Sequence, residues 1–207
     1  MNRWPGTSVA PPHSPGQTWL QTRQQGDAAM GSENTATLDT PPRRPGPQDM
    51  RSVLGHFCTG IGVITGQDGQ RPVGFTCQSI TSVSLDPPYV SFCPSRGSST
   101  WPLIRSSGRM CINILTDDQQ AVCAQFARSS DDKFAGIEWS PAANGAPRLH
   151  DTLATIEADL EYEHGAGDHT IVVVHVTALR AHSGRPLLFY RGDYGGFADR
   201  PTPPTPE

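Results

Sequence analysis

GFTCQSITSVSLDPPYVSFCP, residues 74–94, joins two apolar segments through a run that is rich in hydroxyl side chains. The β-branched and aromatic residues at its two ends predict strands over 71–77 and 89–94. The hydroxyls between them belong to Thr76, Ser79, Thr81, Ser82 and Ser84. On a tight turn, small hydroxyls and backbone N–H groups bind anions without a lysine. The run therefore predicts a turn that binds the phosphate of a nucleotide, or else a Ser/Thr-rich β-turn without a ligand.

More strands are expected on both sides of this run. IGVIT (61–65) and RPVGFTC (71–77) flank a turn that contains Asp68-Gly69, which predicts a β-hairpin. The other strand segments are YVSFCP (89–94), RMCINIL (109–115), ATIEADLEYEH (154–164), GDHTIVVVHVTAL (167–179) and PLLFY (186–190). Many short strands and few helices predict a mainly β fold, a Greek-key or split β-barrel, rather than a doubly wound α/β array.

Three short helices are expected among these strands. The first covers 49–57, with Asp49 as its N-cap and an apolar face made of Met50, Val53, Leu54 and Phe57. The second covers 99–107, and the third covers 117–128 with Thr116 as its cap. A polar stretch with prolines and glycines, 129–150, separates the third helix from the next strands.

Both ends of the chain differ in composition from its centre. Twelve of the 20 prolines lie in 1–49 and 201–207, where apolar residues are sparse and prolines interrupt helices and strands. We therefore expect a disordered N-terminal extension over 1–47, one domain over 48–197 and a disordered tail over 198–207. A domain of about 150 residues buries about 68–70% of its unfolded surface, which is enough for a full core.

Charge, hydropathy and cysteine spacing argue against several classes of protein. The net charge of −4 and the lack of a Lys/Arg block argue against nucleic acid or an anionic membrane as a partner. The sequence has neither an apolar run long enough to cross a membrane nor a secretory signal. The five cysteines form no C-x-x-C pair, so we expect small core residues in a reducing cytoplasm rather than zinc ligands or disulfides.

SRGSST (95–100) is a second candidate phosphate site because it opens the helix at 99–107. Backbone N–H groups at a helix start, with Ser98, Ser99 and Thr100, bind a phosphate or simply cap the helix. Arg96 either adds a charged contact or is solvated.

GDHT (167–170) is a third candidate. Asp168 is placed to orient the ring of His169 by a hydrogen bond, so His169 either reaches a planar cofactor or is an ordinary turn histidine. His175 shares the strand face of His169, but no third ligand is near, so we expect no metal site.

PLLFYRGDYGGF (186–197) ends a strand with two aromatic residues and an arginine, followed by a glycine-rich loop. Phe189 or Tyr190 can stack on a planar ring, and Arg191 can pair with a phosphate. The alternative is a barrel-closing strand with Arg191 in a salt bridge.

Two familiar motifs are absent. GIGVIT (60–65) begins like a dinucleotide-binding G-x-G-x-x-G, but its last position is Thr65 and a strand follows. The sequence has no G-x-S-x-G elbow, which argues against a hydrolase.

Seven segments, taken in order, resemble the short-chain flavin reductase family, which has an FMN-binding split barrel and includes reductase components of two-component aromatic hydroxylases. They are RSVLGHFCTGIGVIT, GFTCQSITSVSLDPP, INIL, QQAVCAQFA, DDKFAGIEW, GDHT and PLLFYRGDY, within about 48–197. The resemblance implies an NAD(P)H:flavin oxidoreductase that supplies reduced FMN or FAD to a separate flavin-dependent monooxygenase, which hydroxylates an aromatic substrate. It also implies a homodimer.

The resemblance also implies roles for individual residues. The flavin is expected to contact Val73, Gly74, Phe75, Thr76, Gln78, Ser79, Cys93, Pro94, Ser95, Ser99, Thr100, Gln125 and Phe126. The nicotinamide cofactor is expected to contact His169, Phe189, Tyr190, Arg191 and Gly192. His169 is expected to position this cofactor, since hydride transfer needs no general acid.

Other functions of the same barrel stay open at this point. A flavin carrier would bind flavin without oxidising NADH, and it would not need His169 or the cluster 189–192. A split-barrel oxidase would act directly on a small substrate, although no substrate-binding insertion is visible. The residues do not choose between FMN and FAD, or between NADH and NADPH.

Overall fold

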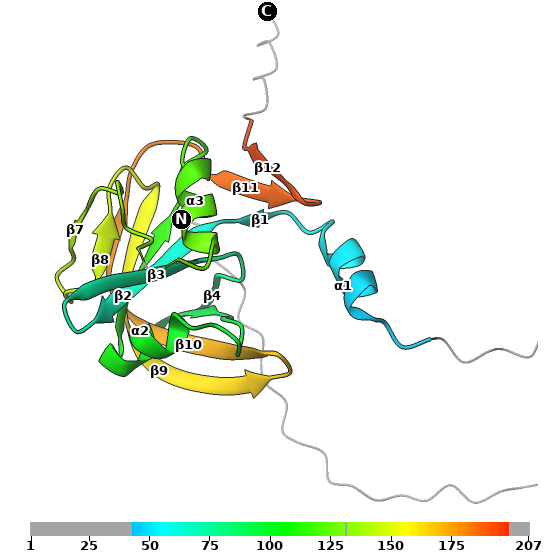
Figure 1. Cartoon of the computed structure of the whole chain (residues 1–207), viewed down its shortest axis with the longest axis horizontal. Coiled ribbons are helices and arrows are strands. Elements are labelled where there is room, and N and C mark those ends of the chain that lie inside the picture. Colours follow the sequence, from blue (N-terminus) through cyan, green and yellow to red (C-terminus); the bar gives the residue numbers. More distant parts are fainter. Residues whose placement is uncertain (1–42, 131, 199–207) are drawn as a thin grey trace, which may run out of the picture. The chain divides into compact units, whose positions relative to one another are not determined.

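The computed structural model describes residues 43–130 and 132–198 of the chain. One antiparallel sheet of seven strands forms most of the fold, with the order β3-β2-β6-β9-β10-β5-β4 (Figure 1). These strands are β2 (Gly62–Asp68), β3 (Arg71–Cys77), β4 (Thr81–Leu85), β5 (Pro88–Phe92), β6 (Arg109–Ile114), β9 (Ala154–Ala166) and β10 (His169–Ala181). Two smaller sheets contain β1 (Thr59–Gly60), β11 (Leu187–Tyr190) and β12 (Asp193–Gly196), and β7 (Trp139–Pro141) and β8 (Pro147–Leu149).

The expected hairpin of β2 and β3 is confirmed. Its register runs from the pair Gly62↔Cys77 to the pair Asp68↔Arg71. Gly69 in the turn has a φ of 63°, a conformation that glycine adopts without a Cβ penalty. This hairpin fixes where each residue of β3 lies along the sheet.

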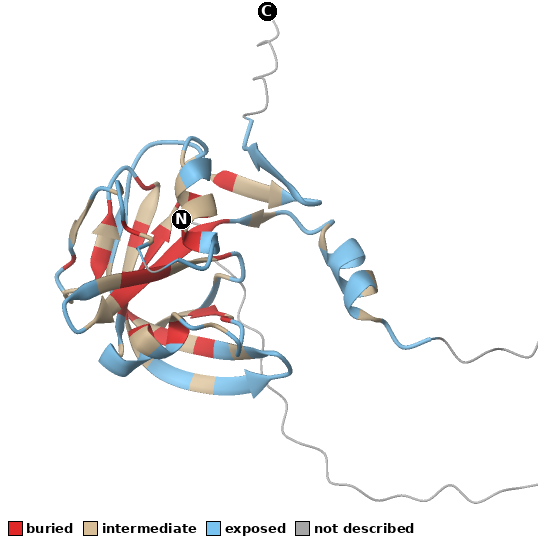
Figure 2. Cartoon of the chain, viewed as in Figure 1, coloured by how far each residue is buried: buried red, intermediate tan, exposed pale blue. Residues whose placement is uncertain are grey.

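The core consists of two clusters of buried side chains. One is built around Phe92, Ile104, Met110, Ile112 and Val174, and the other around Ile61, Val63, Leu115, Phe126 and Leu187. Figure 2 shows buried residues concentrated in the central strands, whereas β12 and the helix α1 (Pro47–Leu54) have none. The mainly β, split-barrel fold is confirmed, and the sheets do not close.

The helices are shorter than expected. α1 ends at Leu54 rather than at Phe57, and Asp49 is its third residue, where its Oδ2 accepts a hydrogen bond from the Gly46 N–H at 2.7 Å. α2 (Trp101–Ser107) follows Ser98, whose Oγ accepts from the Trp101 N–H at 3.1 Å. The expected start of the third helix was wrong. α3 (Gln120–Ala127) begins after Gln119, and the hydroxyl of Thr116 donates to Asp118 Oδ1 instead of capping it.

Two segments that were expected to be turns or loops form strands. Most of the hydroxyl-rich run belongs to β4, because alternating small and apolar residues at 81–85 pair with β5. The glycine-rich segment after Arg191 forms β12, because Arg191 and Gly192 both have positive φ (52° and 94°) and make a two-residue hairpin turn. The predicted turn at 76–84 and loop at 193–196 were therefore wrong in these parts.

The polar stretch 129–150 contains the β7–β8 hairpin, which is held on the sheet by buried polar groups. Asn113 Oδ1 accepts a hydrogen bond from the Leu149 N–H at 2.9 Å, and the Thr65 hydroxyl donates to the Pro147 carbonyl. The side-chain amide of Asn144 donates to the Met110 carbonyl at 2.9 Å. These bonds replace the alternating apolar pattern that would have marked the hairpin in the sequence.

All five cysteines are unpaired. Cys77, Cys111 and Cys123 are buried and Cys93 is half-buried, as the core interpretation predicts, whereas Cys58 is exposed and departs from it. The disorder expected for 1–42 and 199–207 falls outside the described residues. Within the described ranges, no helix has the length and apolar character that a membrane crossing requires.

Candidate active site

Three neighbouring cavities lie along one run of residues, 73–79. Val73 and Gly74 line a cavity of about 170 Å³, and Phe75 and Thr76 line one of about 440 Å³. Gln78 and Ser79 line the largest, of about 990 Å³. β3 pairs with β2 without a bulge and lies at the edge of the sheet. The three cavities therefore follow one another along its unpaired side. The run that the sequence singled out therefore forms the floor of an extended site.

The largest cavity lies between α1, the end of β3 and the β11–β12 turn. Its lining residues are Met50, Arg51, Ser52, Leu54, Gly55, His56, Phe57, Thr59, Gln78, Ser79, His169, Phe189, Arg191 and Gly192. Met50, Leu54, Phe57 and Phe189 give it apolar walls, and all of its ionisable lining groups are bases. Such a cavity suits a molecule that has planar rings and negative charge.

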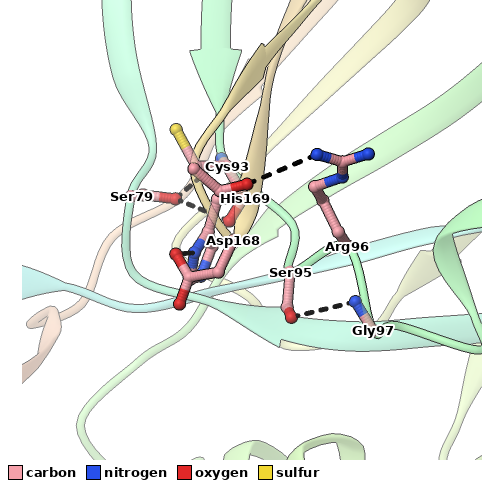
Figure 3. Close-up of polar contacts among 8 residues, drawn as sticks. Ser79, Cys93, Ser95, Arg96, Gly97, Asp168 and His169 are labelled. Carbon is pink, nitrogen blue, oxygen red and sulfur yellow. Dashed lines mark hydrogen bonds and ion pairs between the residues drawn. The ribbon is translucent and has the colours of Figure 1, made fainter.

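His169 enters this cavity from the first position of β10 (Figure 3). Its Nδ1 lies 2.8 Å from Asp168 Oδ1, which confirms the predicted hydrogen bond. This bond and the charge of the ring lower the pKa of Asp168, which therefore stays ionised and favours one orientation of the imidazole. The ring presents its other nitrogen, Nε2, away from Asp168.

The backbone beside His169 is locked to the segment after β5. Ser95 pairs with His169, and the Thr170 N–H donates to the Pro94 carbonyl at 3.0 Å. The Arg96 N–H donates to the Asp168 carbonyl at 2.9 Å. These two hydrogen bonds form the bridge between Ser95 and His169, and they fix the backbone of the histidine against the segment after β5.

Ser79 connects β3 to the same segment (Figure 3). Its Oγ accepts a hydrogen bond from the Cys93 N–H at 2.8 Å and lies 3.3 Å from Cys77 Sγ. Burial raises the pKa of the Cys77 thiol, which keeps it protonated and unreactive. Ser79 and Cys93 therefore join two walls of the site, and Cys77 supports them from the core.

The middle cavity has the character of a phosphate site. It is lined by Phe75, Thr76, Gly97, Ser98, Ser99, Thr100, Phe126, Ala127, Arg128, Ser129, Ser130 and Lys133. Two cations, several hydroxyls and the loop that leads into α2 converge there, while Phe126 forms an apolar wall. Burial lowers the pKa of Lys133, whose Nζ donates to the Phe126 carbonyl at 3.1 Å.

Gly74 shapes the same wall. A Cβ atom added at Gly74 would lie 2.8 Å from Cε1 of Phe126 and 3.1 Å from the Ile64 carbonyl oxygen. The aromatic ring therefore lies directly against the backbone of β3. A flat cofactor needs such a smooth floor, so the residues present fit a ring joined to a phosphate.

Thirteen of the eighteen expected site residues line these cavities. They are Val73, Gly74, Phe75, Thr76, Gln78, Ser79, Ser99, Thr100, Phe126, His169, Phe189, Arg191 and Gly192. The other five have different positions. Cys93, Pro94 and Ser95 support the backbone as described above, and Gln125 Nε2 donates to the carbonyls of Lys133 and Ala135 at 3.0 and 2.9 Å. Tyr190 is half exposed and makes an edge contact with the His56 ring.

Sequence reasoning missed two groups of lining residues. One is the set on α1 and the chain after it, including Arg51 and His56, which were treated only as parts of an amphipathic helix. The other is Arg128 and Lys133 in the middle cavity. Lys133 directly follows two aspartates in DDKFAGIEW, so its charge looked balanced in the sequence, and helical spacing concealed Arg51.

Comparisons with known proteins agree with this geometry. A family model described as "Flavin reductase like domain" matches residues 54–198. The reductase subunit HsaB of a flavin-dependent monooxygenase from Rhodococcus jostii (strain RHA1) is 46% identical over 182 residues, covering 87% of this chain and 88% of that protein. An NADH:FMN oxidoreductase from Rhodococcus qingshengii is 36% identical over 161 residues, covering 75% and 82% of the two chains.

A solved structure is equally similar. The nitrilotriacetate monooxygenase component B from Mycobacterium thermoresistibile superposes with a TM-score of 0.72 at 44% identity, covering 77% of this chain and 92% of that one. This chain is therefore a member of the flavin reductase family, as its motifs predict.

Proposed function

We propose that this protein is an NAD(P)H:flavin oxidoreductase that supplies reduced FMN or FAD to a separate flavin-dependent monooxygenase acting on an aromatic substrate. Family membership and the relatives named as reductases support the flavin reductase activity. The single structural observation that carries the proposal is the order of the cavities along 73–79. A cationic, hydroxyl-rich cavity lies beside an aromatic floor, and a larger cavity with His169 follows.

This order suggests how the two cofactors are held. The middle cavity would take the flavin phosphate through Lys133, Arg128 and the Ser98–Thr100 loop. The ring would lie over residues 74–79, and its far edge would face the largest cavity. His169 and Phe189 would then position the nicotinamide ring against it.

Catalysis in this arrangement is mainly positioning. A flavin held by the middle cavity and residues 74–79 would supply the hydride-accepting chemistry. The chain aligns the two rings, which removes orientational entropy from the barrier. Since β3 is an edge strand, some of its backbone N–H groups do not pair within the sheet, and they are available to stabilise negative charge on the ring. Asp168 holds the His169 imidazole in place for the donor.

A homodimer is part of the proposal. α1 has no buried residue, and its apolar face is open to solvent, with Met50 50%, Val53 69% and Leu54 59% exposed. A helix of eight residues is marginal in water without packing. A second copy of the chain that covers this face would supply that packing and close the outer side of the largest cavity. A cytoplasmic location is also part of the proposal, and the five unpaired cysteines support it.

Oxidation of NADH and NADPH by the full-length protein, followed at 340 nm with FMN, FAD or no added flavin, tests the activity. We expect turnover that depends on flavin, and the comparison identifies the preferred donor and acceptor. Flavin binding without turnover would reject the reductase and favour a flavin carrier. Adding a purified flavin-dependent monooxygenase and its aromatic substrate then tests whether the reduced flavin supports hydroxylation.

A further inference from the structure

The largest cavity has a distinctive charge. Its ionisable lining groups are Arg51, His56, His169 and Arg191, and no Asp or Glu of the described chain lines it. Asp168, the neighbour of the lining residue His169, is already hydrogen-bonded to the His169 ring. A neutral substrate would not need two guanidinium groups in one cavity. The charge therefore indicates an anionic ligand portion that lies beyond the rings.

Arg51 and Arg191 belong to different elements that meet at one glycine. The Arg191 N–H donates to the Gly55 carbonyl at 3.0 Å, and the Gly55 N–H donates to the Arg51 carbonyl at 2.9 Å. A Cβ atom at Gly55 would lie 3.8 Å from the Arg191 Cα and 2.9 Å from the Arg51 oxygen. The last turn of α1 and the β11–β12 turn are thus in close contact, which brings the two arginines to the same end of the cavity.

Neither arginine has another evident task. Within the described residues, the ion pairs involve other side chains, and neither the Arg51 nor the Arg191 guanidinium forms one. Arg191 has a φ of 52°, a conformation that is unfavourable for a residue with a Cβ. The hydrogen bond from His169 chiefly lowers the pKa of Asp168, and the positive charge of Arg51 adds to this effect. Arg51 and His169 line the same cavity.

We propose that Arg51 and Arg191 together form a subsite for the pyrophosphate of the nicotinamide donor, with α1 carrying half of it. The inference rests on the proposed reductase function, and it adds a role in donor binding for Arg51 and for the helix α1. Two guanidinium groups match two linked phosphates, since each is able to make paired hydrogen bonds to phosphate oxygens. The nicotinamide end would then reach His169 and the flavin edge at Ser79.

The test compares Arg51→Gln with the unaltered full-length protein and with Arg180→Gln as a matched control. Arg180 is an exposed arginine on β10 that lines none of the three cavities. Each protein is assayed with NADH, with NADPH and with 1-benzyl-1,4-dihydronicotinamide, a hydride donor without phosphate. The dissociation constant for flavin is measured in parallel by fluorescence quenching.

For Arg51→Gln we expect the KM for both dinucleotides to rise about tenfold or more, the usual effect of losing a charge-assisted hydrogen bond. Turnover with the phosphate-free donor and the flavin dissociation constant should stay unchanged, and Arg51→Lys should recover part of the affinity. A rise for NADPH alone would overturn the proposal, because it would assign Arg51 to the 2′-phosphate. An equal loss with the phosphate-free donor, or no change in KM, would also overturn it.

This design separates two kinds of failure. If the unaltered protein does not oxidise NADH with any flavin, the proposed function fails. The subsite is then tested by NAD⁺ binding in isothermal titration, where equal affinity of the unaltered protein and Arg51→Gln rejects it. If the unaltered protein turns over and Arg51→Gln behaves in the same way, only the subsite fails.

Discussion

The ring of Phe126 on α3 lies against the backbone of Gly74 on β3, so that a single added methyl group at Gly74 would meet the ring at 2.8 Å. This contact joins the core to the floor of the candidate flavin site, because Phe126 belongs to the buried core and also lines the middle cavity. It makes the strand and the helix parts of one surface.

Gly74→Ala should therefore damage both stability and cofactor binding. Overpacking in a core costs about 1–3 kcal/mol, and here the displaced ring also roughens the floor. We expect a lower thermal midpoint and weaker FMN binding, measured by calorimetry and fluorescence titration. Gly60→Ala is the control, since nothing lies within 4 Å of its added Cβ. Unchanged FMN affinity in Gly74→Ala would contradict the assignment of the floor.

Lys133→Met tests the phosphate end. Loss of a charge-assisted contact should weaken FMN binding about tenfold or more, whereas riboflavin, which lacks the phosphate, should bind as before. The pKa of Lys133 is lowered by burial, so its charge is lost at a lower pH than for an ordinary lysine. FMN affinity should accordingly fall as the pH rises through that lowered pKa, with riboflavin unaffected. Equal effects on both ligands would place the phosphate elsewhere.

Val53→Glu tests the homodimer. Val53 is 69% exposed on the apolar face of α1 and does not line the cavities. A buried charge at a subunit interface is costly, so this variant should dissociate to monomers in sedimentation velocity experiments. Gln48→Glu places the same charge on the same helix but off the apolar face, and it should stay dimeric. A monomeric unaltered protein would reject the dimer outright.

The five cysteines should differ in reactivity. Desolvation by burial, and secondarily the charge of Glu157, raises the pKa of Cys111 to about 12. Since the thiolate is the reactive form, Cys111 should resist iodoacetamide at pH 8 in the folded protein, whereas exposed Cys58 should react. Peptide mass spectrometry reports the modified sites, and unfolding in urea should expose all five. Alkylation of native Cys111 would show that the core opens readily.

The sequence predicted most of the sheet because its strands carry β-branched residues in apolar runs. β4 and β12 were missed for the opposite reason: Ser82, Ser84, Gly195 and Gly196 have turn chemistry, and only pairing with β5 and β11 makes them strands. Tertiary contacts override such weak local preferences.

The sequence predicted the part of the candidate site that consecutive residues form, and it missed the part that depends on contacts between distant segments. Residues 73–79 follow one another along β3 and the two residues after it, so their common surface was visible in the sequence. Arg51 reaches the cavity only because Gly55 bonds to Arg191, a contact between residues far apart in the chain. From helical spacing alone, the apolar face of α1 was predicted to pack on the core, and the structure shows that this face is exposed to solvent.

The turn at Gly69 and Gln70 sets the register of the site, although neither residue lines any of its three cavities. From Val73 to Cys77 is about 13 Å at the usual rise of a strand, and the register set by this turn pairs each of these residues with β2 and so places Gln78 and Ser79 after them. Shifting the register by one residue exchanges the two faces of β3. The phosphate cavity, the aromatic floor and the donor cavity would then lose their residues together. A one-residue insertion beside Gly69 would thus remove cofactor binding entirely, while the same insertion beside Gly145, between β7 and β8, would leave it intact.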